Sequence, residues 1–200
     1  MAIAMCRWIG LAAIGASATI SRAQIHEWRA EDGGNGHRYS VVVAPNGISW
    51  SDARTIACML GGDLASVESD AENVFIFLIA AGVEGAWTTT PLGHGRSVVL
   101  GPWLGGLQLD EKHEPSGSWA WVTGAPIGAR GEKGVWWAER EPNNRPDRSG
   151  GGDENRLCFI GIDAKPSPFW NDAEETPRGT GGEPGVRVTS FVVEYPAPGE

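Results

Sequence analysis

The chain has 200 residues, enough for one domain with a hydrophobic core, and its 41% hydrophobic and 20% charged residues are ordinary for a globular protein. The formal net charge of −9, with no cluster of Lys or Arg, excludes the basic footprint of nucleic-acid-binding domains. The 29 glycines predict long, turn-rich connections between the regular elements.

Residues 1–23 have the composition of an export signal. Arg7 gives a positive start, the stretch from Trp8 to Ile20 is apolar or small, and Ser21-Arg22-Ala23 offers small residues at the −3 and −1 positions of a cleavage site. The apolar stretch is too short and too rich in Ala and Gly for a membrane span. An ordinary N-terminal helix is the alternative, but it would have no polar face. We therefore expect a mature chain that starts near Gln24 and is secreted, periplasmic or held at the cell surface.

The mature chain is expected to contain one domain. Residues 24–36 are polar and contain glycine, which is typical of a linker, and the β-branched run at residues 39–43 predicts a first strand. The domain itself is assigned to residues 37–196, followed by a tail at residues 197–200.

Two helices are predicted early in this domain, each by a capping box in which a serine is followed three residues later by an acid. The first box is Ser49–Asp52, and Gly61-Gly62 is expected to end its helix. The second box is Ser69–Glu72, and its helix is expected to run through about Ile79. The apolar side chains of the second helix are Val74, Phe75, Leu78 and Ile79.

Strand signals replace helix signals in the rest of the chain. From Ala80 to Pro102 the sequence is glycine-rich, and no regular element is predicted. The stretch from Gly124 to Asn155 also has little regular pattern, and so long a loop inside a compact domain is usually functional. Strands are predicted at residues 103–107, 118–122, 157–162 and 190–195.

Acidic and amide residues gather in this loop and shortly after it. They form three groups: Glu141-Pro142-Asn143-Asn144, Asp153-Glu154-Asn155 and Trp170-Asn171-Asp172. Ca²⁺ prefers roughly six to eight oxygen ligands from carboxylates, amides and backbone carbonyls. Zinc is disfavoured because no His or Cys lies among these residues. The predicted calcium ligands are Glu141, Asn143, Glu154, Asn171 and Asp172.

Pro142 has a physical role in this prediction. An X-Pro bond can be cis at modest cost, whereas other peptide bonds rarely can. A cis Glu141-Pro142 bond would turn the side chains of Glu141 and Asn143 to the same side, toward one ion.

From about Tyr39 to Tyr195 the chain resembles the C-type lectin family. Each matching piece is short, but their order and spacing together make the resemblance specific. The pieces are Ser49-Trp50-Ser51-Asp52-Ala53 with Cys58, Gly61–Ser69, Glu72-Asn73-Val74-Phe75, Trp103-Leu104-Gly105-Gly106, Trp119-Ala120-Trp121 with Gly124 and Pro126, Trp137, Trp170-Asn171-Asp172 and Phe191–Glu194.

This resemblance implies an α+β double-loop fold, with two helices flanking small antiparallel sheets and a long calcium-binding loop. In sugar-binding members, Glu-Pro-Asn, Trp-Asn-Asp and an intervening Glu hold one Ca²⁺ that also ligates two vicinal sugar hydroxyls. By this resemblance Glu141, Asn143, Glu154 and Asn171 would contact both ion and sugar, and Asp172 the ion. The Glu-Pro-Asn order implies mannose-, glucose-, N-acetylglucosamine- or fucose-type sugars.

The chain departs from the family in its cysteines. The family's last cysteine, expected to pair with Cys58, falls at Val193, and the second pair would sit near Arg156 and Glu175. Cys58 and Cys158 are 100 residues apart, and the sequence leaves open whether they pair.

The loop also departs from the family. Asn143 and Glu154 are 11 residues apart, several more than in compact members, so Asp153 is the alternative for the intervening acid. The family's auxiliary calcium site uses acids where this chain has Asn144 and Asn155, so we expect one calcium ion.

Two functions of different class follow. The first is a calcium-dependent carbohydrate-binding module with glycans or glycoconjugates as partners, for which oligomers or fused modules would add avidity. The second is a lectin-like protein-interaction or structural module without sugar binding. An enzyme is not expected, because the chain has no nucleophile elbow, His-Glu-x-x-His, phosphate-binding loop or dinucleotide fingerprint.

The tryptophans divide into two groups. Trp136 is the one we consider for sugar contact, and the alternative is that it and Trp137 only anchor the loop. The tryptophans expected in the core are Trp50, Trp103, Trp119, Trp121 and Trp170.

Overall fold

The computed structural model describes residues 24–93, 96–144, 153–175 and 187–199, so the predicted export signal and residues 145–152 of the long loop lie outside the described residues. Two helices and a mixed sheet confirm the α+β class. The elements are β1 (Ile25–Glu27), the 3-10 turn η1 (Ala30–Asp32), β2 (Arg38–Val43), α1 (Trp50–Met59), β3 (Asp63–Leu64), α2 (Asp70–Ala81), β4 (Thr88–Gly93), β5 (Arg96–Gln108), the 3-10 turn η2 (Glu111–His113), β6 (Trp119–Trp121), β7 (Glu154–Ile162), β8 (Lys165–Glu174) and β9 (Ser190–Tyr195).

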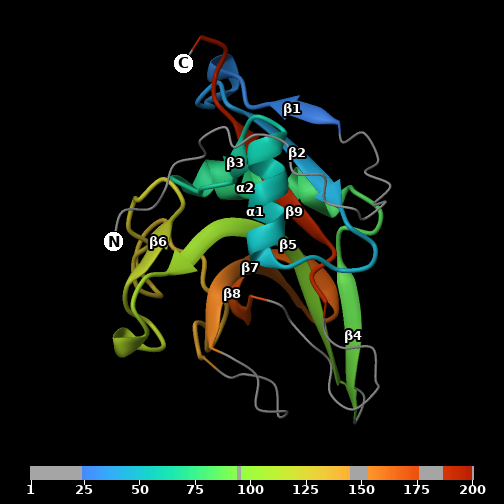
Figure 1. The fold of residues 1–200 in the computed structure, drawn as a ribbon, viewed down its shortest axis with the longest axis vertical. Coiled ribbons are helices and arrows are strands. Elements are labelled where there is room, and N and C mark those ends of the chain that lie inside the picture. Colours follow the sequence, from blue (N-terminus) through green and yellow to red (C-terminus); the bar gives the residue numbers. More distant parts are fainter. Residues whose placement is uncertain (1–23, 94–95, 145–152, 176–186, 200) are drawn as a thin grey trace.

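The sheet brings the two ends of the domain together (Figure 1). The described strands follow the order β1-β2-β9-β5-β7-β8, and β3, β4 and β6 attach beside this path. β9 is antiparallel to β2 and meets β5 in parallel where Phe191 lies opposite Trp103. The last strand therefore lies next to the first part of the domain, and β7 and β8 extend the sheet beyond β5.

Both helices begin where the capping boxes predict. The Ser49 side chain accepts a hydrogen bond from the backbone N–H of Asp52, at 3.0 Å, and the Ser69 side chain accepts one from Glu72, at 3.2 Å. Gly61 follows α1 with a φ of 89°, a left-handed conformation that glycine adopts without strain. Within the described part of the chain, no helix is long and apolar enough to cross a membrane.

The buried face of α2 does not coincide with the apolar residues that the sequence shows in this helix. Val74 and Leu78 are 39% and 62% exposed, so two of the four expected apolar positions face solvent. The buried positions of the helix are Glu72, Asn73, Ile76 and Ala80. Burial in this helix does not follow hydrophobicity alone, because two of its buried side chains are polar and find hydrogen-bond partners elsewhere in the fold.

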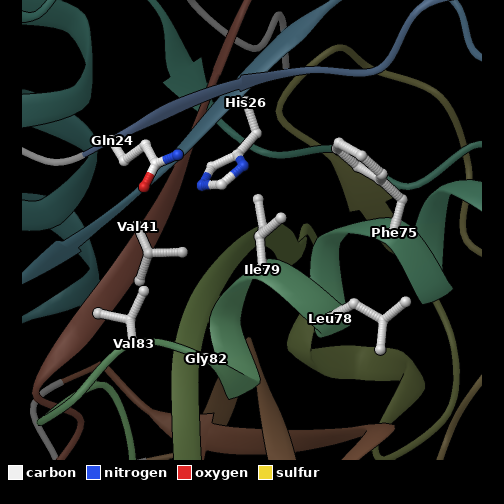
Figure 2. Close-up of a pocket in the computed structure, with 8 residues that line it drawn as sticks. All are labelled: Gln24, His26, Val41, Phe75, Leu78, Ile79, Gly82 and Val83. Atoms are coloured by element: carbon white, nitrogen blue, oxygen red, sulfur yellow. The ribbon is translucent and has the colours of Figure 1, made fainter.

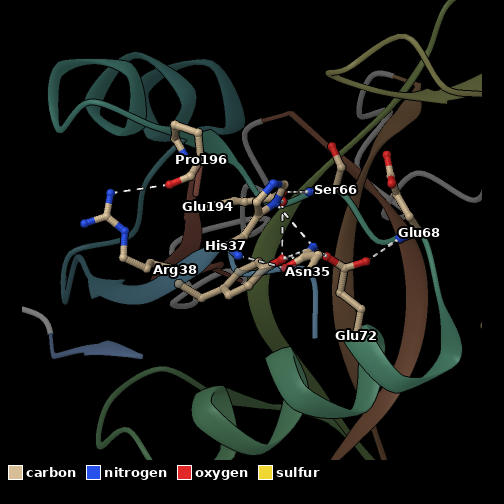
Figure 3. Close-up of polar contacts among 9 residues, drawn as sticks. Asn35, His37, Arg38, Ser66, Glu68, Glu72, Glu194 and Pro196 are labelled. Atoms are coloured by element: carbon tan, nitrogen blue, oxygen red, sulfur yellow. Dashed lines mark hydrogen bonds and ion pairs between the residues drawn. The ribbon is translucent and has the colours of Figure 1, made fainter. Parts of the chain in front are cut away.

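Glu72 belongs to a largely buried polar network around Tyr39 (Figure 3). The Tyr39 hydroxyl lies 2.5 Å from Glu72 Oε1 and 3.3 Å from Glu194 Oε1. His37 Nδ1 lies 2.6 Å from the same Glu194 oxygen, and the backbone N–H of Ser66 donates to Glu194 Oε2 at 2.8 Å. Burial raises the pKa of Glu194, which these contacts partly oppose. The network joins β2, α2 and β9.

The linker expected at residues 24–36 is instead part of the domain. β1 pairs antiparallel with β2, and Trp28 is buried and stacks on Phe75 with ring centroids 5.7 Å apart. Asn35 donates to Glu72 Oε1 at 3.1 Å. The segment looked like a linker because its few apolar residues are separated by polar ones, and its order comes from contacts with β2 and α2.

The glycine-rich stretch from Ala80 to Pro102 also forms regular structure. β4 pairs antiparallel with the first half of β5, from Thr88 opposite Leu100 to Gly93 opposite Arg96. The strand expected at residues 103–107 is thus the second half of the longer β5. In Figure 1 the paired strands extend away from the helices.

The tryptophans predicted to lie in the core are buried, and several contact one another beneath the long loop. Trp137 meets Trp119 and Trp170 edge to face, with ring centroids 4.9 and 5.9 Å apart, and Trp121 meets Trp170 at 5.3 Å. This aromatic layer gives the loop that carries the acid and amide residues a rigid base. The five tryptophans that were predicted to lie in the core and are buried are Trp50, Trp103, Trp119, Trp121 and Trp170.

Candidate functional site

The acid and amide residues come together at one end of the β7–β8 pair. Glu154 is the first residue of β7, and Asn171 and Asp172 lie on β8, opposite Cys158 and Leu157. Glu141 and Asn143 lie on the loop that precedes β7. Segments about 30 residues apart in the sequence are therefore brought together by a single strand pairing.

Asp172 ties this loop to the strand. Its Oδ2 atom accepts hydrogen bonds from the backbone N–H groups of Asn143 and Asn144, at 2.8 and 2.7 Å. Its side chain is almost fully buried, with 1% of the residue exposed. Burial raises the pKa of the Asp172 carboxyl, and the two backbone hydrogen bonds work in the opposite direction.

Glu141 and Asn143 face each other across Pro142. The Glu141-Pro142 peptide bond is cis, as the sequence analysis expected. The amide nitrogen of Asn143 donates a hydrogen bond to Glu141 Oε2, so the two side chains lie on the same side of the chain. The loop then closes on β7, because the backbone N–H of Glu154 donates to Asn144 Oδ1 at 3.0 Å.

The buried thiol of Cys158 lies within electrostatic reach of several site residues. Burial raises the pKa of this thiol, and the negative charges of Asp172, Glu154 and Glu141 raise it further, while a hydrogen bond with Asn171 lowers it. Four of the five predicted ligands thus affect the pKa of one buried thiol. Cys158 is a free cysteine, so it forms no disulfide with Cys58.

Two oxygen atoms of the site are buried and have no hydrogen-bond partner among the described residues. They are Asn143 Oδ1 and Asp172 Oδ1. A buried polar atom without a partner is costly, and an oxygen in this position is satisfied by a donor or by a cation. Carboxylate and amide oxygens are hard ligands, so the chemistry of the residues fits Ca²⁺.

The carboxylates do not form a closed metal cluster by themselves. Among the described residues, no group of three or more His, Cys, Asp or Glu side chains is arranged to hold a metal ion. Amide and backbone oxygens would therefore have to complete the coordination of an ion at this place. Asn143 donates to the Glu141 carboxylate, and Asn171 donates to the backbone carbonyl of Asp172, so both amides lie next to acidic residues of the site.

Glu174 is a residue at this site that the sequence analysis did not single out. It lies opposite Glu154 in the β7–β8 pairing, and both side chains are partly buried. Like charges directly opposite each other across two strands are destabilising unless something compensates them. The signal that could have found Glu174 is its place two residues after Asp172, on the same face of a strand that was not predicted.

Asp153, the alternative to Glu154, is exposed and precedes the first residue of β7. Residues Arg145 to Gly152 of the loop lie outside the described residues. The structure thus brings Glu141, Asn143, Glu154, Asn171 and Asp172 into one neighbourhood, with Glu174 beside them.

A cavity of about 420 Å³ lies between β1, β2 and α2 (Figure 2). Apolar side chains form most of its wall, and Gln24 and His26 point into it from the start of the described chain. None of the five predicted ligands lines this cavity, so it is separate from the acid and amide site. The other residues around it are Val41, Phe75, Leu78, Ile79, Gly82 and Val83.

Comparisons of the sequence find no matching protein-family profile and no matching curated protein. Comparisons of the structure do find relatives in fold. The carbohydrate-recognition domain of cow CD23, solved in the presence of a GlcNAc2Man3 oligosaccharide, is 20% identical with a TM-score of 0.50, over 80% of this chain and 88% of that one. The Kupffer cell C-type lectin receptor Clec4f, described as trimeric, is 22% identical with a TM-score of 0.51, over 83% of this chain and 82% of that one.

A calcium-independent type II antifreeze protein is also similar, with 17% identity and a TM-score of 0.49 over 82% of this chain and 88% of that one. At these identities the likeness concerns the fold. Two helices and a mixed sheet in the described residues, with the matches to CD23 and Clec4f, show that this chain has a C-type lectin-like fold.

Proposed function

We propose that this domain binds one Ca²⁺ ion at the acid and amide site and holds two vicinal hydroxyls of a sugar through that ion. The observation that carries the proposal is a pair of oxygens, Asn143 Oδ1 and Asp172 Oδ1, that are buried without a hydrogen-bond partner among the described residues and lie near the Glu141 carboxylate. A cation placed between them would satisfy both oxygens and offset the charge of the carboxylates. The proposed ligands are Glu141, Asn143, Glu154, Asn171 and Asp172.

Each residue has a distinct task in this proposal. Asp172 holds the loop in place through the backbone N–H groups of Asn143 and Asn144, while its second oxygen is left for the ion. Glu141 can only accept hydrogen bonds, whereas the amide of Asn143 carries two donor hydrogens. The two side chains thus present an acceptor and a donor to the hydroxyls of one sugar, while the bound ion supplies the positive charge that holds both hydroxyl oxygens.

The resemblance to Glu-Pro-Asn lectins supports sugars of the mannose type. The CD23 domain that shares the fold was solved in the presence of a mannose-containing oligosaccharide. We infer that glycans or glycoconjugates are the partners and that the mature domain starts near Gln24 and acts outside the cytoplasm. A single site on this surface is shallow, so avidity from several copies would strengthen binding.

A glycan array tests this proposal directly. The mature chain should retain mannose- or fucose-terminated glycans in millimolar calcium and lose them in a chelator. Asp172→Ala should retain no glycan even in millimolar calcium, because the variant lacks both a ligand of the ion and the hydrogen-bond acceptor that holds the loop. An array without calcium-dependent spots would overturn the proposal and favour a lectin-like protein-interaction module instead.

A further inference from the structure

Trp136 and Phe169 form an aromatic pair at the protein surface. Their ring centroids are 5.8 Å apart and their planes are tilted by 48°. Phe169 is 39% exposed and Trp136 is partly exposed, so each ring contacts the other and also solvent. Water around two large aromatic rings is unfavourable, and such rings are frequent in binding surfaces.

The pair is held in place by the backbone beside it. The backbone N–H of Trp170 donates to Trp136 O at 2.7 Å, and that of Ala138 donates to Trp170 O at 2.9 Å. The Trp136 indole N–H donates to Asp70 Oδ1 at the start of α2, at 2.8 Å. Trp136 is therefore held at two places: its backbone carbonyl binds β8, and its indole N–H binds the start of α2.

The hydrogen bonds of Trp136 anchor the loop, but the close core contact between the loop and β8 is made by the neighbouring residues. Trp137 and Trp170, the next residue on each segment, are buried and meet edge to face. Trp136 is partly buried against the core, whereas Phe169 is 39% exposed. The part of each ring that faces solvent is thus available to bind something else.

The pair lies on the same two segments as the proposed calcium ligands. On β8, Phe169 and Asn171 lie on the same face of the strand, roughly 7 Å apart at a rise of about 3.3 Å per residue. On the loop, Trp136 precedes Glu141, and the residues between them include the exposed Glu139 and Arg140. A ligand longer than one sugar ring can span this distance.

We propose that Trp136 and Phe169 form a second sugar subsite that takes the sugar next to the one held at the calcium site. A pyranose ring has an apolar face of C–H groups that stacks on an aromatic ring, and its hydroxyls at the ring edge lie within reach of the Asp70 carboxylate. The preferred ligand is therefore an oligosaccharide rather than a monosaccharide. This inference rests on the proposed function, because the first sugar is placed by the calcium site.

Titration calorimetry of the mature chain in calcium tests it, with D-mannose and a linear mannotriose as the two probes. The trisaccharide should bind at least about fivefold more tightly than mannose. Trp136→Ala and Phe169→Ala should each weaken trisaccharide binding roughly five- to tenfold, as truncated aromatic contacts commonly do, and leave the mannose affinity unchanged. Trp136→Phe should retain part of the gain. Leu78→Ala, which truncates an exposed side chain of α2, is the matched control and should change neither affinity.

The outcomes separate the two proposals. If mannose and mannotriose bind equally well to wild type, or if the aromatic variants weaken both alike, the subsite is wrong and the calcium site stands. If neither probe binds while calcium is present, the proposed function fails and the subsite fails with it. An unchanged melting temperature of each variant relative to wild type shows that the loss of affinity does not come from unfolding.

Discussion

Arg156 and Glu175 form an ion pair, with Nη2 of Arg156 2.9 Å from Oε2 of Glu175. The resemblance to C-type lectins places a disulfide near these two positions. The Arg156 guanidinium also lies 5.0 Å from the centroid of the Trp50 ring, and the backbone N–H of Trp50 donates to Glu175 O at 3.0 Å. Noncovalent contacts thus join the end of the β7–β8 pair to the first residue of α1, where the family has a covalent link.

Arg156→Ala should lower the free energy of unfolding by about 1–3 kcal/mol. The substitution removes a largely buried side chain that packs on Trp50, while the ion pair itself contributes little because Glu175 is 38% exposed. Arg156→Lys should recover only part of this loss, because an ammonium cannot stack as a planar guanidinium does. Urea unfolding curves measure both changes.

The control is Arg29→Ala, which removes an ion pair whose side chains are 58% and 69% exposed. This substitution should change the free energy of unfolding by no more than about 0.5 kcal/mol. If Arg156→Ala and Arg29→Ala gave the same urea unfolding curve, the Arg156 contacts would not stabilise the fold as proposed.

The elements that sequence analysis predicted are those decided by local contacts. The two capping serines, Ser49 and Ser69, act within one helical turn, so the starts of α1 and α2 can be read from short motifs. β9 coincides with the predicted strand because a β-branched and aromatic run ends at a proline.

β8 was not predicted because its composition argues against a strand. It contains Pro166, Pro168, Asn171 and Asp172, all of which are depleted in strands. β8 is the last strand on the sheet path, where prolines are tolerated, and it forms because it pairs with β7 along most of its length. The contacts that decide this strand are tertiary, and no local pattern contains them.

The buried polar residues of α2 show the same limit. Asn73 accepts a hydrogen bond from the Trp170 indole N–H at 2.8 Å and donates to Pro168 O at 2.9 Å. Both partners lie on β8, more than 90 residues further along the chain. Sequence analysis could therefore name the site residues by motif, but it could not predict that Asp172 holds the backbone of the loop or that Glu174 faces Glu154.

Cys158 should be unreactive in the folded protein. Its thiol is buried and its raised pKa leaves little thiolate near neutral pH, and the thiolate is the reactive form. An alkylating reagent should modify Cys158 only after denaturation, without any reductant. Mass spectrometry of the modified peptide measures this, and a requirement for reductant would contradict a free thiol at this position.

The mature protein should begin at Gln24 or a close neighbour. This follows from the charged start, apolar stretch and small residues of positions 1–23, which is the pattern that signal peptidases cleave. Mass spectrometry of protein recovered from its native host would show the terminus. A terminus at Met1 or Met5 would contradict export by this signal.

Calcium should raise the thermal stability of the mature domain. A ligand that binds only the folded state stabilises it by RT ln(1 + [L]/Kd), about 2.7 kcal/mol at a hundredfold excess over Kd. Melting curves in millimolar calcium and in a chelator measure the difference. Asp32→Ala, which removes an exposed acid remote in sequence from the site, should keep the calcium shift. Identical melting curves for wild type in the two buffers would exclude a calcium site of useful affinity.

The order of Glu141 and Asn143 should determine which sugars the domain prefers. The carboxylate of Glu141 only accepts hydrogen bonds and the amide of Asn143 donates them, so exchanging the two chemistries reverses the donor and acceptor pattern around the ion. Wild type should prefer mannose-like over galactose-like ligands, and Glu141→Gln with Asn143→Asp should weaken or reverse that preference while calcium still raises the melting temperature. The sugar preferences of wild type and of the double variant can be measured by retention on immobilised mannose, fucose and galactose.

Asp172→Ala should act differently from this exchange. Its carboxylate is buried and holds the backbone of Asn143 and Asn144, so its loss should abolish calcium stabilisation and sugar binding together rather than redirect specificity. If calcium-loaded wild type is not retained on mannose or fucose, the sugar-binding proposal is wrong. If Asp172→Ala is retained as well as wild type, sugar is bound somewhere other than the acid and amide site, because no sugar can be held through an ion whose buried ligand has been removed.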